Sequence, residues 1–166
     1  MKNTLQKIHT FFVKLPIVWF ILIIIALDFL ISFSILFVLY EIIKIHKPNS
    51  YAYSYFLQFP YWLLLIILLP TAFIETIIYQ WFVIKLLRSF NYFKNKIIII
   101  VLISAFLFGI SHFNSLIHQI STFFSGTVLA YSFIVAEEKK VSPILIVTII
   151  HFMINIILFS IINLFK

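Results

Sequence analysis

The sequence predicts an all-α integral membrane protein, a helical bundle with about five transmembrane helices. Of its 166 residues, 64% are hydrophobic and 10% are charged, whereas water-soluble domains are about 45–50% apolar and about 25% charged. A soluble fold of this length could not bury so much apolar surface. Strands would need the alternating pattern of a closed barrel, which the sequence lacks, so we expect every span to be a helix.

Polar breaks divide the chain into five apolar runs, and each run is a predicted membrane helix. The runs cover residues 15–40, 61–87, 97–112, 119–136 and 143–165. The third run is shorter than the roughly 20 residues that cross a bilayer, so we expect it to end inside the protein. The first run exceeds the apolar part of a signal peptide, about 7–15 residues, and we interpret it as a retained span.

The spans are expected to form one membrane domain over residues 1–166, with an N-terminal span and outer loop in 1–58 and a four-helix core in 59–166. Cytoplasmic loops of membrane proteins are rich in Lys and Arg. A cytoplasmic N-terminus places nine basic residues inside and three outside. The inner ones are Lys2, Lys7, Lys14, Lys85, Arg88, Lys94, Lys96, Lys139 and Lys140, and the outer ones are Lys44, Lys47 and Lys166. This bias explains the net charge of +7, and we expect no nucleic-acid partner.

Four polar residues lie inside or at the ends of the apolar runs: Glu75, His112, His151 and Asn155. A charge at the bilayer centre costs between about 3 and more than 10 kcal/mol, so such residues are rare and usually functional. Their spread over three runs suggests one shared site. The chain has no cysteine, which excludes thiolate ligands and cysteine nucleophiles.

Each polar residue also has a purely structural interpretation. A protonated Glu75 could hydrogen-bond across a helix interface, His112 could cap a helix, and His151 and Asn155 could bond between helices. His118 is interpreted as a loop histidine. We expect Asp28, in the first span, to bond to a nearby serine such as Ser32.

Four-residue spacings place pairs of these side chains on common helix faces. Glu75 pairs with Tyr79, and Thr76 pairs with Gln80 on the adjoining face. Phe108 pairs with His112, and Gly109 between them allows close approach of another helix. His151 pairs with Asn155 in the last span.

In order and spacing, these motifs resemble the CAAX protease and bacteriocin-processing family, also called the Abi family. That family has E-E-x-x-x-R, F-x-x-x-H and H-x-x-x-N motifs on successive membrane helices. Glu75 matches the first glutamate, Phe108 and His112 match the second motif, and His151 and Asn155 match the third. The resemblance extends from Tyr61 to the C-terminus.

The chain departs from the family pattern at two linked positions. Thr76 replaces the second glutamate and Gln80 replaces the arginine. Loss of one member of a buried ion pair would leave a charge unpaired, at a cost of about 3–5 kcal/mol. We therefore interpret the change as coordinated, with Thr76 and Gln80 forming a neutral hydrogen-bonded pair.

The resemblance implies an intramembrane endopeptidase that cuts a membrane-associated peptide or protein within the lipid bilayer. In this reading Glu75 and His112 activate water, and His151 and Asn155 stabilise the oxyanion. Alternatively, Glu75, His112 and His151 could bind a divalent metal such as zinc, which would activate the water. The sequence does not decide between these mechanisms. Asparagine is an unusual zinc ligand, which slightly disfavours a zinc site.

Two other functions stay open at this stage. A bacteriocin self-immunity protein, without catalysis or with a specialised activity, would accommodate the changes at Thr76 and Gln80. A small transporter or scaffold would be favoured by inverted repeats or broken helices, which we do not detect. We expect the chain to lie in a bacterial plasma membrane.

Overall fold

The computed structural model describes residues 2–39, 60–113 and 115–164, and within these ranges every regular element is helical. The elements are α1 (Lys2–Lys14), α2 (Ile17–Phe37), α4 (Tyr61–Glu75), η2 (Thr76–Phe82), α5 (Val83–Ser89), α6 (Ile97–Ile110), α7 (Leu116–Glu138) and α8 (Pro143–Leu164). The segment η2 is a π-helix that joins α4 to α5. The predicted outer loop, with Lys44 and Lys47, lies outside the described residues.

The prediction of an all-α membrane bundle is confirmed. Four described helices are long and apolar enough to cross a membrane, namely Ile17–Phe37, Trp62–Ser89, Leu116–Glu138 and Pro143–Ile161. Ile97–Ile110 is a shorter apolar helix, as expected for the third run. Together they account for the five predicted spans.

The fourth span begins earlier than its hydropathy suggested, because a serine caps it. The Ser115 hydroxyl accepts a hydrogen bond from the backbone N–H of His118 at 3.1 Å, as an N-cap residue does. His118 therefore lies in the first turn of α7, and its interpretation as a loop histidine is wrong.

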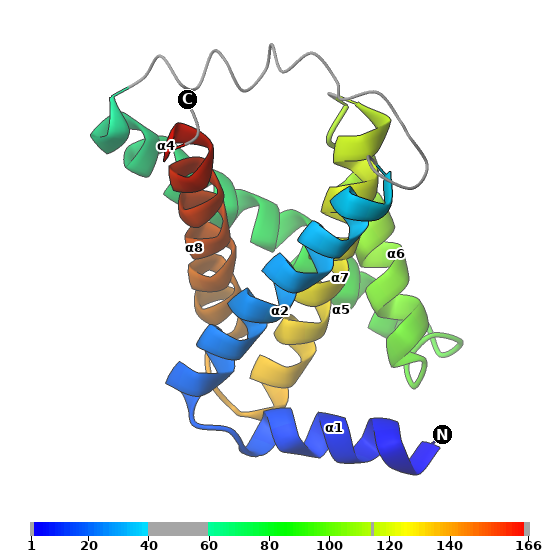
Figure 1. Cartoon of the computed structure of the whole chain (residues 1–166). Coiled ribbons are helices and arrows are strands. Elements are labelled where there is room, and N and C mark those ends of the chain that lie inside the picture. The colour runs from blue at the N-terminus through cyan, green and yellow to red at the C-terminus, as the bar shows by residue number, and fades with distance from the viewer. Residues whose placement is uncertain (1, 40–59, 114, 165–166) are drawn as a thin grey trace.

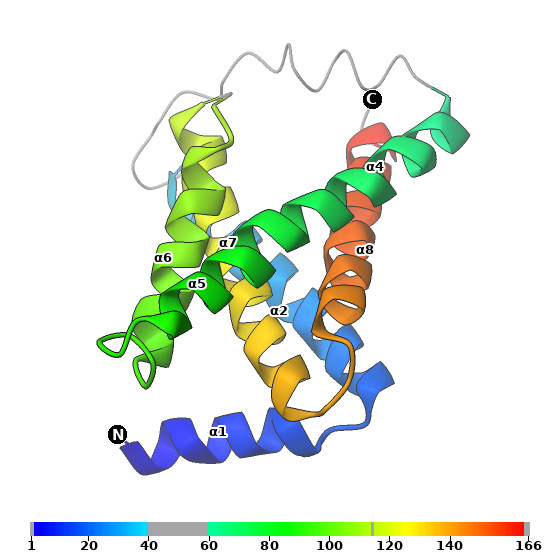
Figure 2. The same ribbon diagram turned by 180° about the vertical axis from the view of Figure 1, so that it is seen from behind.

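Helix α1 lies across one end of the bundle, where the turn from α7 to α8 also lies (Figures 1 and 2). Lys139, at the end of α7, holds it there. Its ammonium group donates to the backbone carbonyls of Phe12 at 3.2 Å, Val13 at 2.8 Å and Leu15. A cation suits these carbonyls, which form the negative end of the helix dipole. The sequence analysis did not predict α1 as a helix.

Helix α7 is the centre of the bundle and packs against α1, α2, α6, α8 and η2. The largest fully buried side chains come from all five spans. They include Phe20, Ile24, Ile84, Ile100, Phe108, Leu129, Phe133, Val147 and Ile150. The close packing of α6, α7 and α8 brings motifs from distant parts of the sequence together.

The two glycines set the distance between α6 and α7. A Cβ atom at Gly109 would lie 2.9 Å from the carbonyl oxygen of Gln119 and 2.9 Å from the Cβ of Phe123. A Cβ atom at Gly126 would lie 2.8 Å from the Cδ1 of Phe108. Small residues permit such close approach between membrane helices.

Asp28 bonds to a different partner from the one predicted. Its carboxylate accepts a hydrogen bond from the Ser125 hydroxyl of α7 at 2.6 Å, and its side chain is buried. The expected bond to Ser32 is wrong, because Asp28 faces the neighbouring helix instead of its own next turn. The bond ties α2 to the centre of the bundle.

Candidate active site

The first motif lies where the second long span changes from α-helix to π-helix. Glu75 is the last residue of α4, five positions after Pro70, and η2 begins at the next residue. Segments of π-helix inside α-helices are frequent at functional sites. The Ser104 hydroxyl of α6 donates to the backbone carbonyl of Tyr79 at 2.8 Å, and this bond fixes η2 against α6.

Glu75 and His151 face each other across the interface between α4 and α8. The Oε2 of Glu75 lies 3.4 Å from the Nε2 of His151. His151 is buried, whereas the Glu75 side chain retains 24% of its exposure. Within the described residues, the Nδ1 of His151 makes no hydrogen bond of good geometry. The backbone of Ala72 lies close to the imidazole.

Phe108 is the aromatic centre of the site. Its ring lies 4.7 Å from the ring of His112, 5.6 Å from that of His151 and 5.4 Å from that of Tyr79, between centroids. All three contacts are edge-to-face, a favourable geometry for aromatic rings. Phe108 is buried, so side chains from η2, from α8 and from the end of α6 meet around one buried ring.

His112 follows the end of α6, and a backbone carbonyl orients it. Its Nδ1 lies 2.8 Å from the carbonyl oxygen of Phe108. A neutral histidine makes this bond by donating from Nδ1–H, which leaves Nε2 as the acceptor nitrogen. The Ser111 hydroxyl donates to the same carbonyl at 2.7 Å. In this state, the Nε2 of His112 carries a lone pair that can accept a proton.

His118 is a member of this group that the sequence analysis missed. Its ring centroid lies 5.2 Å from that of His112, at an interplanar angle of 84°. The six-residue separation hides the contact, because the chain turns between α6 and α7. Ser115, three positions before His118, was the available signal for a helix start at this point.

Asn155 lies one turn beyond His151 on α8 and is partly buried. The four-residue spacing places the amide beside the imidazole on one face. Glu75, His112 and His151 are thus linked by direct contacts or through Phe108, and Asn155 shares the α8 face of His151 by its spacing.

The predicted hydrogen-bonded pair of Thr76 and Gln80 is wrong. Both side chains are fully buried, and within the described residues none of their polar atoms has a hydrogen-bond partner. Both residues lie in η2, where i→i+5 bonding changes the stacking of side chains four residues apart. The Thr148 hydroxyl of α8 is also buried without a partner there.

The residues expected to bind zinc do not form a three-ligand site in this arrangement. In the described part of the chain, no three His, Asp or Glu side chains converge closely enough to hold a metal ion. His112 commits Nδ1 to the Phe108 carbonyl, which leaves Nε2 as its ligating nitrogen. A metal requirement stays a prediction.

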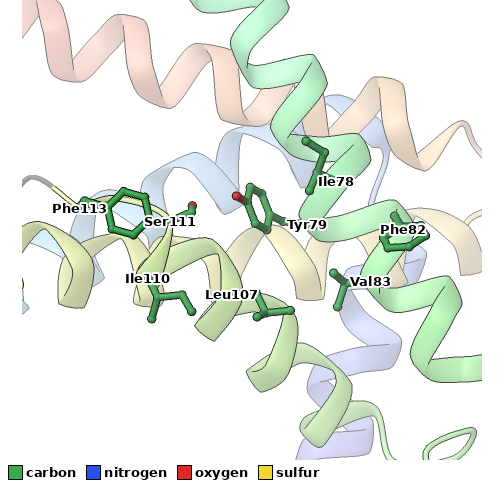
Figure 3. A pocket seen from close by; sticks show the side chains of 8 residues that line it. All are labelled: Ile78, Tyr79, Phe82, Val83, Leu107, Ile110, Ser111 and Phe113. Atoms are coloured by element: carbon green, nitrogen blue, oxygen red, sulfur yellow. The ribbon is translucent and has the colours of Figure 1, made fainter.

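A hollow of about 410 Å³ lies between η2 and α6, beside the aromatic centre (Figure 3). Its lining is mostly apolar and consists of Ile78, Tyr79, Phe82, Val83, Leu107, Ile110, Ser111 and Phe113. Tyr79 contacts Phe108, and Ser111 adjoins His112 in the chain. The lining of the hollow is therefore in contact with the aromatic centre through Tyr79.

The arrangement can be compared with known proteins. The family model described as type II CAAX prenyl endopeptidase Rce1-like matches residues 57–157, more than half of the chain. Comparisons with curated proteins and with solved structures give no significant match. The matched range contains Glu75, His112, His151 and Asn155, and the match confirms the resemblance that the three motifs predicted. The chain belongs to the Rce1-like family of type II CAAX prenyl endopeptidases.

Proposed function

We propose that the protein is an intramembrane endopeptidase that hydrolyses a peptide bond of a membrane-associated substrate. The observation that carries the proposal is the contact between Glu75 and the buried His151 at 3.4 Å, with His112 joined to His151 through the ring of Phe108. An ionisable side chain within a membrane span is costly and usually functional. The gathering of one carboxyl group and two imidazoles from separate helices therefore favours a shared catalytic role.

In the proposed reaction, Glu75 and His112 position a water molecule and remove its proton as the water oxygen attacks the substrate carbonyl carbon. The free Nε2 of His112 and the carboxylate of Glu75 are both suitable acceptors for that proton. The partial exposure of Glu75 leaves space beside the carboxylate for a water molecule.

His151 and Asn155 would stabilise the negative charge that develops on the carbonyl oxygen. An N–H from the Asn155 amide, and one from the His151 imidazole, can donate to an oxyanion, and such bonds are strong in a site without bulk water. The tetrahedral intermediate then collapses. The carbon–nitrogen bond breaks, and the proton held by Glu75 or His112 passes to the leaving amine.

The Glu75–His151 contact connects the two halves of this mechanism. A proton shared between carboxylate and imidazole would keep both groups oriented before substrate binds. No step requires the Thr76–Gln80 pair, because these side chains are fully buried and uncharged.

The hollow between η2 and α6 supports a substrate that approaches from the lipid. Several of its lining residues, including Ile78, Phe82 and Phe113, are exposed on the surface of the bundle. An extended apolar peptide segment fits such a surface, and Tyr79 and Ser111 contribute the polar groups. The substrate's identity is a separate question that a peptide library in lipid would answer.

The proposal is tested with purified protein in nanodiscs and a pool of membrane-anchored peptides. The wild type should cleave, and Glu75→Gln should reduce cleavage by at least about a thousandfold while remaining folded, since it removes both the base and its charge. Glu138→Gln is a matched control, because Glu138 lies at the far end of α7, bonded to His9. A fully active Glu75→Gln variant would refute the mechanism.

A second candidate function is bacteriocin self-immunity without catalysis. The observation that favours it is the loss of the ionic pair at Thr76 and Gln80, whose side chains are buried without hydrogen bonds in the described structure. Survival of bacteria exposed to a bacteriocin would be compared between wild type and Glu75→Gln. Protection that persists in the variant would favour this function over proteolysis.

A further inference from the structure

His118 has no place in the three motifs, yet its ring lies against that of His112. The centroids are 5.2 Å apart and the rings are nearly perpendicular, at 84°. His112 also contacts the edge of Phe108 at 4.7 Å and bonds its Nδ1 to the Phe108 carbonyl. Two rings and one backbone bond therefore restrain a single imidazole.

The position of His118 is itself fixed by the start of α7. Its backbone N–H donates to the Ser115 hydroxyl at 3.1 Å. Next to it, the carbonyl of Gln119 lies so close to Gly109 that a Cβ atom there would be 2.9 Å from the oxygen. Helix α7 is thus pressed against the last turn of α6, and His118 cannot move far from His112.

We propose that His118 is a positioning residue for His112, an inference that rests on the proposed function. Its ring holds the His112 ring in the orientation that keeps Nδ1 on the Phe108 carbonyl and leaves Nε2 free. Without this contact, only the backbone bond and the Phe108 ring would restrain His112 among these contacts, so its ring could turn and the other tautomer would become accessible. Both changes reduce the fraction of protein with a correctly placed base.

The test combines kinetics with nitrogen NMR of protein labelled with ¹⁵N-histidine. The chain has five histidines, and the His112 signals are assigned by their loss in His112→Gln. We expect the wild-type His112 to give the spectrum of one neutral tautomer, protonated at Nδ1. In His118→Ala, the two nitrogen shifts of His112 should move toward each other as the tautomers exchange.

The kinetic arm predicts a fall in kcat of about tenfold for His118→Ala with KM nearly constant, since a small misplacement of a catalytic group costs about this much. His118→Phe keeps a ring at the contact without any titrating nitrogen, and it should restore the single tautomer and most of kcat. The matched control is His9→Ala, because His9 bonds Glu138 and Tyr131 at the other end of α7.

The outcomes separate this inference from the proposed function. A His112 spectrum and kcat that stay at wild-type values in His118→Ala would overturn the positioning role. A spectrum that changes in His118→Ala, in a protein that cleaves no peptide, would support the contact and overturn the peptidase function. If His118→Ala unfolds, His118→Leu decides, because it fills the space without an aromatic ring. A lost tautomer preference in that folded variant supports the role of the ring, and wild-type spectra and kcat contradict it.

Discussion

Replacing Gly126 by alanine should disturb the candidate active site, although Gly126 is not one of its residues. The new Cβ atom would lie 2.8 Å from the Cδ1 of Phe108, whereas ordinary contacts begin at 3.4 Å, a deficit of 0.6 Å (3.4 − 2.8). Phe108 is buried and cannot turn away. Overpacking of this kind costs about 1–3 kcal/mol of unfolding free energy.

The same displacement should reduce activity, because Phe108 contacts both His112 and His151. A misplacement of about 1 Å can cost about a hundredfold in rate, so a shift of roughly 0.6 Å predicts a loss of about tenfold. Stability would be measured by unfolding in mixed detergent micelles, and activity by peptide cleavage in nanodiscs. Phe124→Ala is the control, since Phe124 is exposed on the same helix.

A second substitution separates packing from catalysis. Combining Gly126→Ala with Phe108→Ala removes the ring atom that clashes, so Gly126→Ala should cost less unfolding free energy in the Phe108→Ala background than in the wild type. Activity should remain low, because the ring contacts to His112 and His151 are gone. If Gly126→Ala alone has wild-type stability and activity, α6 and α7 do not approach as closely as the structure shows, and the reasoning fails.

Three further predictions concern polar groups around the bundle. Thr76→Glu and Gln80→Arg should each destabilise the protein by about 3–5 kcal/mol, because each places an unpaired charge at a fully buried position; a melting temperature equal to that of the wild type would contradict this burial. Ser125→Ala should cost about 1–3 kcal/mol by removing the donor to buried Asp28, with equal melting temperatures as the contrary result. Lys139→Met should loosen α1 and expose it to limited proteolysis, and unchanged cleavage patterns would show that its carbonyl contacts do not hold the helix.

Hydropathy was sufficient to predict the membrane spans. The described helices begin or end within a few residues of the predicted runs, and the differences arise from local chemistry. The hydroxyl of Ser115 extends α7 toward its N-terminus, and the amphipathic α1 lacks the apolar composition on which the span prediction relied.

The site could be predicted only in part, because spacing arguments assume a regular α-helix. The spacing of Phe108 and His112 survives, since α6 is regular up to Ile110. The spacing of Thr76 and Gln80 failed because η2 is a π-helix. The contacts of Asp28 with Ser125 and of His112 with His118 depend on how helices pack, and a single sequence does not contain that information.

The most direct test of the account is to measure hydrolysis in water enriched in ¹⁸O. Wild-type protein that cleaves a membrane peptide should place one ¹⁸O atom in each new carboxyl group, and Glu75→Gln should give no labelled product. Equal labelling by wild type and Glu75→Gln would contradict the central role of the carboxylate that faces His151.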